Sequence, residues 1–305
     1  MKYSDLAEVA RTLRRFPPAF RVVPEREAAL LRLDSLFGEA DSEIHPAMGR
    51  FYRARVDETL EEIEAYSEKT PRFWKLYSSG FIIKSGARTI TVDVNGGCTP
   101  PCGRTCITLS LPQIRRIAEL TDEYYVTHSH EDHISPLLCD ALTRRGKRLV
   151  MPAEAIRRWM VRGATPAEEL RSRHTRAFLN FQGNLPCAMY LFTLANGRTV
   201  MVRGDIYHKE GFCACVDKVR EWGQTVDYAF LTPYAEADYS PVAMLGKAFP
   251  SSRFIPIHEW EFSHRRFGQA GAATQCFAEL LATFRTWYKK NRVQFLAWGE
   301  SIDLQ

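Results

Sequence analysis

Three histidines and one aspartate fall within six consecutive positions, in the run His128-Ser129-His130-Glu131-Asp132-His133. Imidazole nitrogen and carboxylate oxygen are donors that suit zinc, and also iron and manganese. The run follows the apolar and aromatic residues 124–126, which are typical of a buried strand. Because rigid scaffolds usually present chemistry on loops at strand ends, the pattern predicts a metal site on this loop.

The spacing within the run indicates two adjacent metal positions. His128 and His130 are two residues apart, so they point the same way if the period of the strand continues. Asp132 and His133 lie on the turn that follows and can face a second position. Structural zinc sites usually have four protein ligands, many of them cysteines, and no open coordination position. This run contains no cysteine, so an open and reactive site is favoured over a structural one.

Further chemistry-bearing residues follow other predicted strands. Asp93 ends a strand expected over 89–93, which is preceded by a strand at 80–83. Asp205 follows a strand at 199–203 as part of a Gly-Asp pair, and His258 follows a strand at 254–257.

These features together resemble the metallo-β-lactamase fold family. The H-x-H-x-D-H run, the early strand pair, the Gly-Asp pair and the late histidine stand in the order that the family shows. The Pro-Ile-His ending at His258 resembles that of the ascorbate-phosphate lactonase branch. The resemblance covers about residues 73–300. It implies an α/β (α+β) class, with a four-layer αββα sandwich in which two mixed sheets face each other and helices lie outside.

The resemblance also implies a set of metal ligands. It places a first metal on His128 and His130, a second metal on Asp132, His133 and His258, and Asp205 between the two metals as a bridging ligand.

One histidine of the family pattern is missing. The third ligand of the first metal normally ends a strand between the run and the Gly-Asp pair, and Gln182 stands in the place that we assign to it. His174 lies eight residues earlier and is a poor substitute. Because an amide oxygen is a weaker ligand than imidazole, we predict a lopsided centre whose second metal is bound more firmly. An ordinary hydrogen-bonding role for Gln182 is the alternative.

The chemistry follows from the ligands. A catalytic metal keeps one position open for water and lowers the pKa of that water from about 16 to about 7. The resemblance therefore implies a metal-dependent hydrolase, in which a metal-bound hydroxide attacks an ester, lactone, amide or phosphoester. Asp132 would orient the hydroxide and accept a proton. The expected cofactors are one or two divalent ions, zinc first and manganese or iron as alternatives, and the expected partner is a small-molecule substrate.

Two other functions stay open. The diiron, oxygen-reducing members of the family carry glutamate where this chain has His130, which argues against a redox function. Iron-dependent sulfur dioxygenases resemble the H-x-H-x-D-H pattern, however, so an oxidoreductase of that kind is the first alternative. A non-catalytic metal-binding module is the second, and it predicts metal binding without turnover.

Composition limits the remaining possibilities. The chain has 305 residues, is 45% hydrophobic and carries a net charge of +5, so it can bury a sizeable core. Its basic residues are interspersed rather than clustered with aromatic ones, and no nucleic-acid partner is expected. The sequence shows no signal peptide and no apolar stretch of membrane-spanning length, so a cytoplasmic protein without a membrane partner is expected.

The eight cysteines are expected to be reduced thiols. Cys139, Cys187 and Cys276 lie in apolar contexts that predict core positions, and Cys213 and Cys215 are expected to pack in a helix or turn. A separate group, Cys98, Cys102 and Cys106, follows no standard metal-binding spacing, and we interpret it as a loop shaped by proline and glycine.

The predicted elements divide the chain into a helical N-terminal extension, 1–70, and a catalytic domain, 71–305. The extension could cap the active site or form a dimer face, which leaves a homo-oligomer open. Helices are expected at 4–16, 25–38, 52–68, 111–120, 137–145, 153–162, 210–222, 240–249 and 272–290. Besides the strands named above, strands are expected at 123–127, 148–151, 176–181, 188–194, 228–231 and 293–298, with a hairpin turn at Asn196-Gly197.

The loops after the predicted strands would line the substrate pocket. Candidate lining residues are Tyr207, His208, Tyr234, Tyr239, Glu259, Trp260 and His264. The aromatic rings could stack on a substrate ring, whereas His208 and His264 could bind a phosphate or protonate a leaving group.

Overall fold

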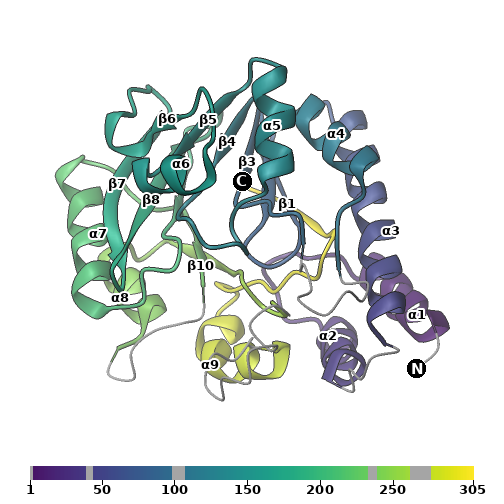
Figure 1. The fold of residues 1–305 in the computed structure, drawn as a ribbon. Helices are drawn as coiled ribbons and strands as arrows, with labels where there is room; N and C mark the ends of the chain where they lie inside the picture. Colours follow the sequence, from purple (N-terminus) through teal and green to yellow (C-terminus); the bar gives the residue numbers. More distant parts are fainter. Residues whose placement is uncertain (1–2, 39–43, 98–106, 233–238, 262–275) are drawn as a thin grey trace.

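The computed structural model describes residues 3–38, 44–97, 107–232, 239–261 and 276–305 (Figure 1). Its helices are α1 (Tyr3–Arg15), α2 (Pro24–Gly38), α3 (Ile44–Ala65), α4 (Leu111–Leu120), α5 (Pro136–Arg144), α6 (Ala153–Trp159), α7 (Lys209–Glu221), α8 (Pro241–Ala248) and α9 (Phe277–Lys289), with a short 3-10 helix η1 (Ala167–Glu169). Its strands are β1 (Arg72–Lys75), β2 (Phe81–Ser85), β3 (Arg88–Val92), β4 (Glu123–Tyr125), β5 (Arg148–Met151), β6 (Thr165–Pro166), β7 (Thr175–Gln182), β8 (Leu185–Thr193), β9 (Thr199–Val202), β10 (Tyr228–Leu231), β11 (Arg253–Pro256) and β12 (Ser301–Asp303).

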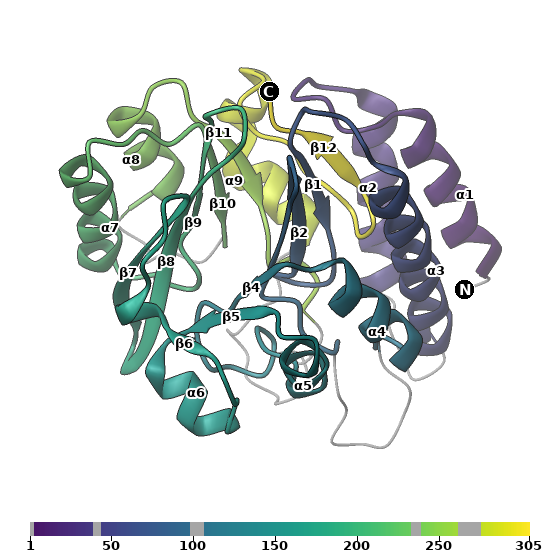
Figure 2. The same cartoon turned by 90° about the horizontal axis from the view of Figure 1, so that it is seen from above.

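The strands form two mixed sheets that face each other. In the described residues the larger sheet has seven strands in the order β12-β1-β2-β3-β4-β5-β6, and the smaller has five in the order β11-β10-β9-β8-β7. Figure 2 shows α7 and α8 outside the smaller sheet, and α3, α4 and α5 outside the larger one. The arrangement is the four-layer αββα sandwich that the sequence predicts.

The two-residue period of the strands explains the layers. Alternate residues of each strand point to opposite faces, and in β8 both sets are mostly apolar, so both faces can be covered. The set between the sheets includes Ile90, Val92, Tyr190, Val200 and Val202, and all five side chains are buried. The outward set packs against the helices.

Local signals fix the elements around the metal run. Ser135 caps α5 by accepting a hydrogen bond from the amide of Leu138, with Pro136 in the first turn. Ser110 and Gln113 form a reciprocal capping box at the start of α4. The predicted turn at Asn196-Gly197 joins the antiparallel strands β8 and β9, and Gly197 has a φ of 82°, which glycine tolerates.

The N-terminal helices share a hydrophobic core with the rest of the chain. Leu13 of α1, Leu33 of α2 and Leu60 of α3 belong to the same buried cluster as Trp74 of β1. A buried ion pair adds to this contact, because the guanidinium of Arg26 on α2 binds both carboxylate oxygens of Glu300 near the C-terminus. The division at residue 70 stays a prediction.

Several predicted boundaries were wrong. The third helix begins at Ile44, eight residues before the predicted start, because Pro46 lies in the first helical turn, where its missing N–H costs nothing. The sixth helix ends at Trp159 rather than 162, and Met160 has a left-handed φ of 50°. The strand predicted at 293–298 is reduced to one bridge between Phe254 and Val293. The last strand is β12, which pairs with β1.

Across the described residues, no helix is both long enough and apolar enough to span a bilayer.

Candidate metal centre

Parallel strands bring the candidate donors to one edge of the two sheets. β3 pairs with β4 in parallel, and β9, β10 and β11 are parallel to one another. The carboxyl ends of β3, β4, β9 and β11 carry Asp93, the metal run, Asp205 and His258, respectively. Residues as distant in the sequence as Asp93 and His258 thus converge because of strand direction.

Four donors form the centre of this site. One ligand atom from each of Asp132, His133, Asp205 and His258 lies within 4.8 Å of all the others, and the four residues are buried. Nε2 of His258 lies 2.9 Å from Oδ2 of Asp132 and 3.5 Å from Oδ2 of Asp205. Nε2 of His133 lies 3.4 Å from each of the same two oxygens. Both imidazoles therefore aim the same nitrogen at a common pair of carboxylates.

His128 and His130 lie beside this group but not within it. β4 ends at Tyr125, so the period of the strand does not extend to these histidines. Their rings nevertheless meet, with 3.0 Å between Nε2 of His128 and Nδ1 of His130. Nε2 of His128 is 3.9 Å from Oδ2 of Asp205. His128 is fully buried, whereas His130 is only partly buried. Asp205 is the carboxylate that both sets of histidines approach.

Asp93 holds the run in place from the neighbouring strand. One carboxylate oxygen accepts the amide N–H of Thr127 at 2.7 Å. The other accepts the hydroxyl of Thr127 at 2.7 Å and faces Nδ1 of His133 at 2.9 Å. When the ring of His133 is neutral, as a metal ligand must be, the carboxylate on Nδ1 keeps the single proton there and leaves Nε2 available to the metal. Asn95 adds a second support by donating to the carbonyl of Asp132.

Burial and mutual charge shift the titration of the cluster. Burial lowers the pKa of His128 well below its usual range, and the neighbouring His133 lowers it further. Burial alone would also lower the pKa of His133 and His258, but the surrounding carboxylates, chiefly Asp132 and Asp205, raise both. The same histidines hold the pKa of Asp132 and Asp205 below the usual range, against the opposing effect of burial.

Gln182 reaches the centre. It is the last residue of β7, where it pairs with Leu185, and its Nε2 lies 3.4 Å from Oδ2 of Asp205. His174 is exposed and precedes the other end of the same strand, so it cannot take this place. The structure therefore puts Gln182, and not His174, beside Asp205. Whether the amide binds metal stays a prediction.

The residues present fit a metal ion. Within the described part of the chain, the buried atoms Nε2 of His133, Oδ1 of Asp205 and Oε1 of Gln182 have no hydrogen-bond partner. Buried polar atoms are normally satisfied, and orphans of this kind indicate a missing ion or water. Imidazole with carboxylate is the donor set of zinc, manganese and iron sites.

The predicted pocket residues differ in their placement. Tyr207 and His208 are partly buried and in ring contact, with 4.1 Å between centroids, and Tyr239 donates to the carbonyl of Tyr207 at 2.7 Å. Tyr234 and His264 lie outside the described residues.

Trp260 and Glu259 need correction as substrate contacts. Trp260 is 2% exposed and its indole N–H donates to Asp34 on α2. Glu259 is 1% exposed and faces Nζ of Lys75 at 3.2 Å. Both side chains are enclosed by protein, because the backbone turns at His258 and directs them inward.

The cysteines follow the predictions with one exception. Cys139, Cys187 and Cys215 are buried, and Cys213 and Cys215 lie on α7. Cys276 is only partly buried, since it occupies the N-cap of α9 rather than the core. Cys98, Cys102 and Cys106 fall outside the described residues.

Sequence reasoning missed the residues that support the donors. Asp93 was expected at a strand end, but its bonds to Thr127 and His133 were not. Asn95 and Asp34 were missed altogether. The one available signal was the polar pair Asp93 and Asn95 directly after an apolar strand, which is a common place for a supporting carboxylate or amide.

Comparison with solved structures agrees with the fold. No model of a protein family matches the sequence, and no curated protein matches it. A possible metal-dependent hydrolase from Veillonella parvula DSM 2008 matches 77% of this chain and 100% of its own, with a TM-score of 0.57 and 11% identity. An isothiocyanate hydrolase from Delia radicum gut bacteria matches 77% of this chain and 99% of its own, with a TM-score of 0.55 and 13% identity.

Two further structures extend the comparison. Igni18, a metallo hydrolase from Ignicoccus hospitalis, has a TM-score of 0.52 and 15% identity over 77% of this chain and 99% of its own. An E377D mutant of the CmlA β-hydroxylase has a TM-score of 0.51 and 13% identity over 93% of this chain and 60% of its own. The protein thus belongs to the class of two-sheet αββα proteins, and its candidate metal donors lie at one sheet edge. More particularly, the chain has the metallo-β-lactamase fold.

Proposed function

We propose that the protein is a metal-dependent hydrolase that acts on an ester, lactone or phosphoester of a small molecule. The observation that carries the proposal is the convergence of Asp132, His133, Asp205 and His258, whose ligand atoms lie within 4.8 Å of one another. Burying two carboxylates close together is unfavourable because their charges repel and lose their contact with water. A bound cation would compensate for this cost.

Each residue has a role in this proposal. His133 and His258 would bind the more firmly held metal together with Asp132, and Asp205 would connect that metal to His128 and His130. When bound, the metal supplies a water of lowered pKa and polarises the oxygen of the scissile bond. Asp132 would orient the attacking water and accept its proton at a carboxylate oxygen. Asp93 keeps the proton of His133 on Nδ1, as the 2.9 Å contact indicates.

Metal content and turnover should be measured on the same preparations. Plasma mass spectrometry on wild type should find one or two zinc or manganese ions per chain, and Asp205→Ala should lower the count. A panel of lactones, esters and phosphodiesters would then identify the substrate class. On any substrate found, Asp132→Ala should lower the rate more than tenfold, since general acid–base groups contribute about a hundredfold or more. Full metal content without turnover on the panel would favour the binding module.

An iron-dependent oxidation is the second candidate function. The donor set of imidazole and carboxylate also suits non-haem iron, and the likeness to the CmlA β-hydroxylase spans 93% of this chain. His130 argues for hydrolysis, because the resemblance ties glutamate at that position to diiron redox members. Iron as the only bound metal, together with oxygen consumption on a thiol or persulfide substrate, would establish the iron-dependent oxidoreductase and exclude the hydrolase.

A further inference from the structure

The four residues from His258 to Glu261, which we name the strap, connect the metal donors to the N-terminal helices. His258 has a φ of 76° and Trp260 a φ of 52°, and both are non-glycine residues in the left-handed region. Such conformations are uncommon for bulky side chains and persist only where the surrounding structure enforces them. The strap must therefore be held by contacts.

Each side chain of the strap has its own anchor. His258 points its Nε2 at Asp132, and its amide donates to the carbonyl of Ser78 at 3.2 Å. Glu259 faces Lys75, and Glu261 accepts from the hydroxyl of Tyr77 at 2.9 Å. These anchors belong to the metal edge, to the last residue of β1 and to the segment that follows β1.

The fourth anchor, that of Trp260, comes from the N-terminal helices. Oδ1 of Asp34 on α2 accepts the indole N–H of Trp260 at 2.8 Å and the amide of Phe277 at 2.9 Å. Oδ2 of the same carboxylate accepts the amide of Ala278 at 2.7 Å. Phe277 and Ala278 begin α9, so Asp34 serves as a helix cap supplied by another helix. One carboxylate thus fixes the strap and the start of α9 together.

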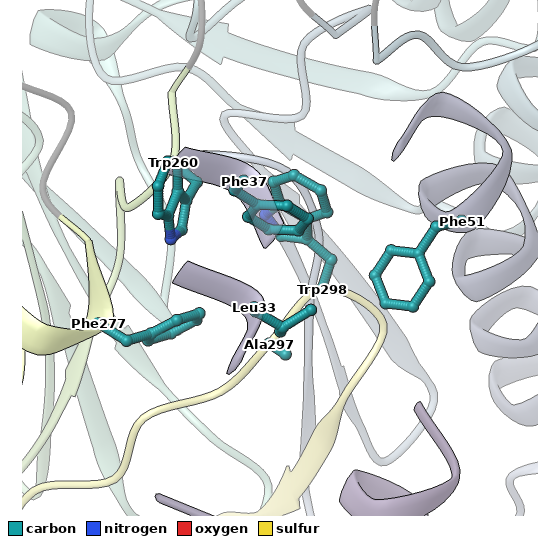
Figure 3. A pocket seen from close by; sticks show the side chains of 7 residues that line it. All are labelled: Leu33, Phe37, Phe51, Trp260, Phe277, Ala297 and Trp298. Carbon is teal, nitrogen blue, oxygen red and sulfur yellow. The ribbon is translucent and has the colours of Figure 1, made fainter. Parts of the chain in front are cut away.

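Aromatic packing makes this anchor stiff. Figure 3 shows the ring of Trp260 beside Phe37, with Phe277 below it, Trp298 next to Phe37, and Phe51 farther to the right. The centroids of Trp260 and Phe37 are 5.2 Å apart in an edge-to-face contact, and Phe37 stacks on Trp298 at 5.0 Å. The space among these side chains is too small to admit a water molecule. Trp260 is therefore closely packed in its present position.

We propose that Asp34 is a positioning residue for the metal centre, and that the N-terminal helices act through it to aim His258. By fixing Trp260, two residues further along, Asp34 enforces the left-handed turn that directs Nε2 of His258 toward Asp132 and Asp205. This proposal rests on the proposed function only in so far as the centre binds a metal; it does not depend on the reaction catalysed.

The test compares metal affinity in four variants of the full chain. Asp34→Ala removes all three acceptor contacts, and Trp260→Phe keeps an aromatic ring but removes the donor. Asp57→Ala is the matched control. Asp57 on α3 accepts a hydrogen bond at 2.8 Å from the side chain of Gln113, which lies after residue 70 and far from the strap in sequence. Zn²⁺ and Co²⁺ affinities would be measured by competition with a chelator, and the visible spectrum of the Co²⁺ form would be recorded.

We expect Asp34→Ala and Trp260→Phe to weaken Zn²⁺ binding about tenfold, as supporting residues of metal sites commonly do, and to shift the Co²⁺ bands. Asp57→Ala should leave both unchanged even if its melting temperature falls. Asp34→Asn keeps an oxygen for Trp260 and should restore most of the affinity. If Trp260→Phe folds and binds Zn²⁺ as wild type does, the proposal is wrong.

The outcomes separate this proposal from the proposed function. Wild-type metal binding without turnover on any substrate, combined with the affinity loss in Asp34→Ala, would support the positioning role and overturn the hydrolase. Turnover by wild type with unchanged affinity in Asp34→Ala and Trp260→Phe would overturn the positioning role alone. A wild-type chain that binds neither Zn²⁺ nor Co²⁺ would overturn both.

Discussion

Replacement of Asp93 by asparagine tests whether the protonation of His133 is set from β3. The amide oxygen can still accept the N–H of Thr127, and the hydroxyl of Thr127 can rotate to accept from the new NH₂ group. His133 has no such freedom, because the NH₂ group can only donate to Nδ1. The proton of His133 must then move to Nε2, the nitrogen that lies 3.4 Å from Asp132 and Asp205.

The magnitude follows from the bond that is lost. A hydrogen bond to a charged group contributes about 1.5–3 kcal/mol. Asp93 is buried, so solvent does not screen this contact. Since 1.4 kcal/mol corresponds to a factor of about ten, Asp93→Asn should weaken metal binding roughly ten- to a hundredfold. The measurement is the Zn²⁺ dissociation constant at pH 7.5, obtained by competition with a chromophoric chelator.

Asp227 provides a matched control. Its carboxylate accepts both the amide and the hydroxyl of Thr199, at 2.8 and 3.1 Å, as the carboxylate of Asp93 does with Thr127. It lies at the opposite ends of the strands, before β10. Asp227→Asn should lower stability without changing the affinity for Zn²⁺. The tautomer argument is refuted if Asp93→Asn binds Zn²⁺ within about threefold of wild type, or if both variants lose affinity equally.

Three other perturbations test separate parts of the site. Gln182→His should raise the metal content measured by plasma mass spectrometry toward two per chain, because imidazole replaces a weak amide beside Asp205; an unchanged content would remove the support for a lopsided centre. The pKa values of His133 and His258 are raised in the folded chain, so their contribution to stability is complete below about pH 6.5 and is lost as the pH rises through the folded values. The chelated protein should therefore melt at a lower temperature at pH 9 than at pH 6, and saturating Zn²⁺ should reduce the difference, since the metal replaces the protons; a flat profile would contradict the charge assignment. Gly204→Ala should lower the free energy of unfolding by more than about 1 kcal/mol in chemical denaturation, because Gly204 has a φ of 60° and a methyl group there would lie 2.8 Å from Cβ of Thr127; a change within error would show that Thr127 moves without cost.

The gathering of the candidate donors at one sheet edge was predictable because it depends on local patterns. The two-residue period of apolar side chains locates the ends of β3, β4, β9 and β11. The candidate donors follow these ends within a few residues. The parallel direction of these strands then brings the ends together. Gln182 was placed by the same reasoning, and the hairpin pairing of Gln182 with Leu185 agrees with it.

The residues that hold the donors in place were not predictable, because their roles depend on contacts between distant segments. Nothing in the residues around Asp34 indicates that its carboxylate meets Trp260 and Phe277. Aromatic residues on a loop after a strand look alike whether they line a pocket or fill a core, so Trp260 was assigned to substrate. The last strand shows a related limit: residues 293–298 have strand-like composition because they are buried, but burial does not specify pairing.

The two histidines of the four-donor cluster are controlled by different parts of the chain. His133 is oriented by Asp93, which follows β3 of the larger sheet. His258 is oriented through Trp260 by α2, which lies in the N-terminal section. α2 is itself fastened by the buried pair of Arg26 and Glu300, and removing one partner of such a pair leaves an uncompensated charge. A division at residue 70 therefore separates segments of sequence that the metal centre requires to fold together.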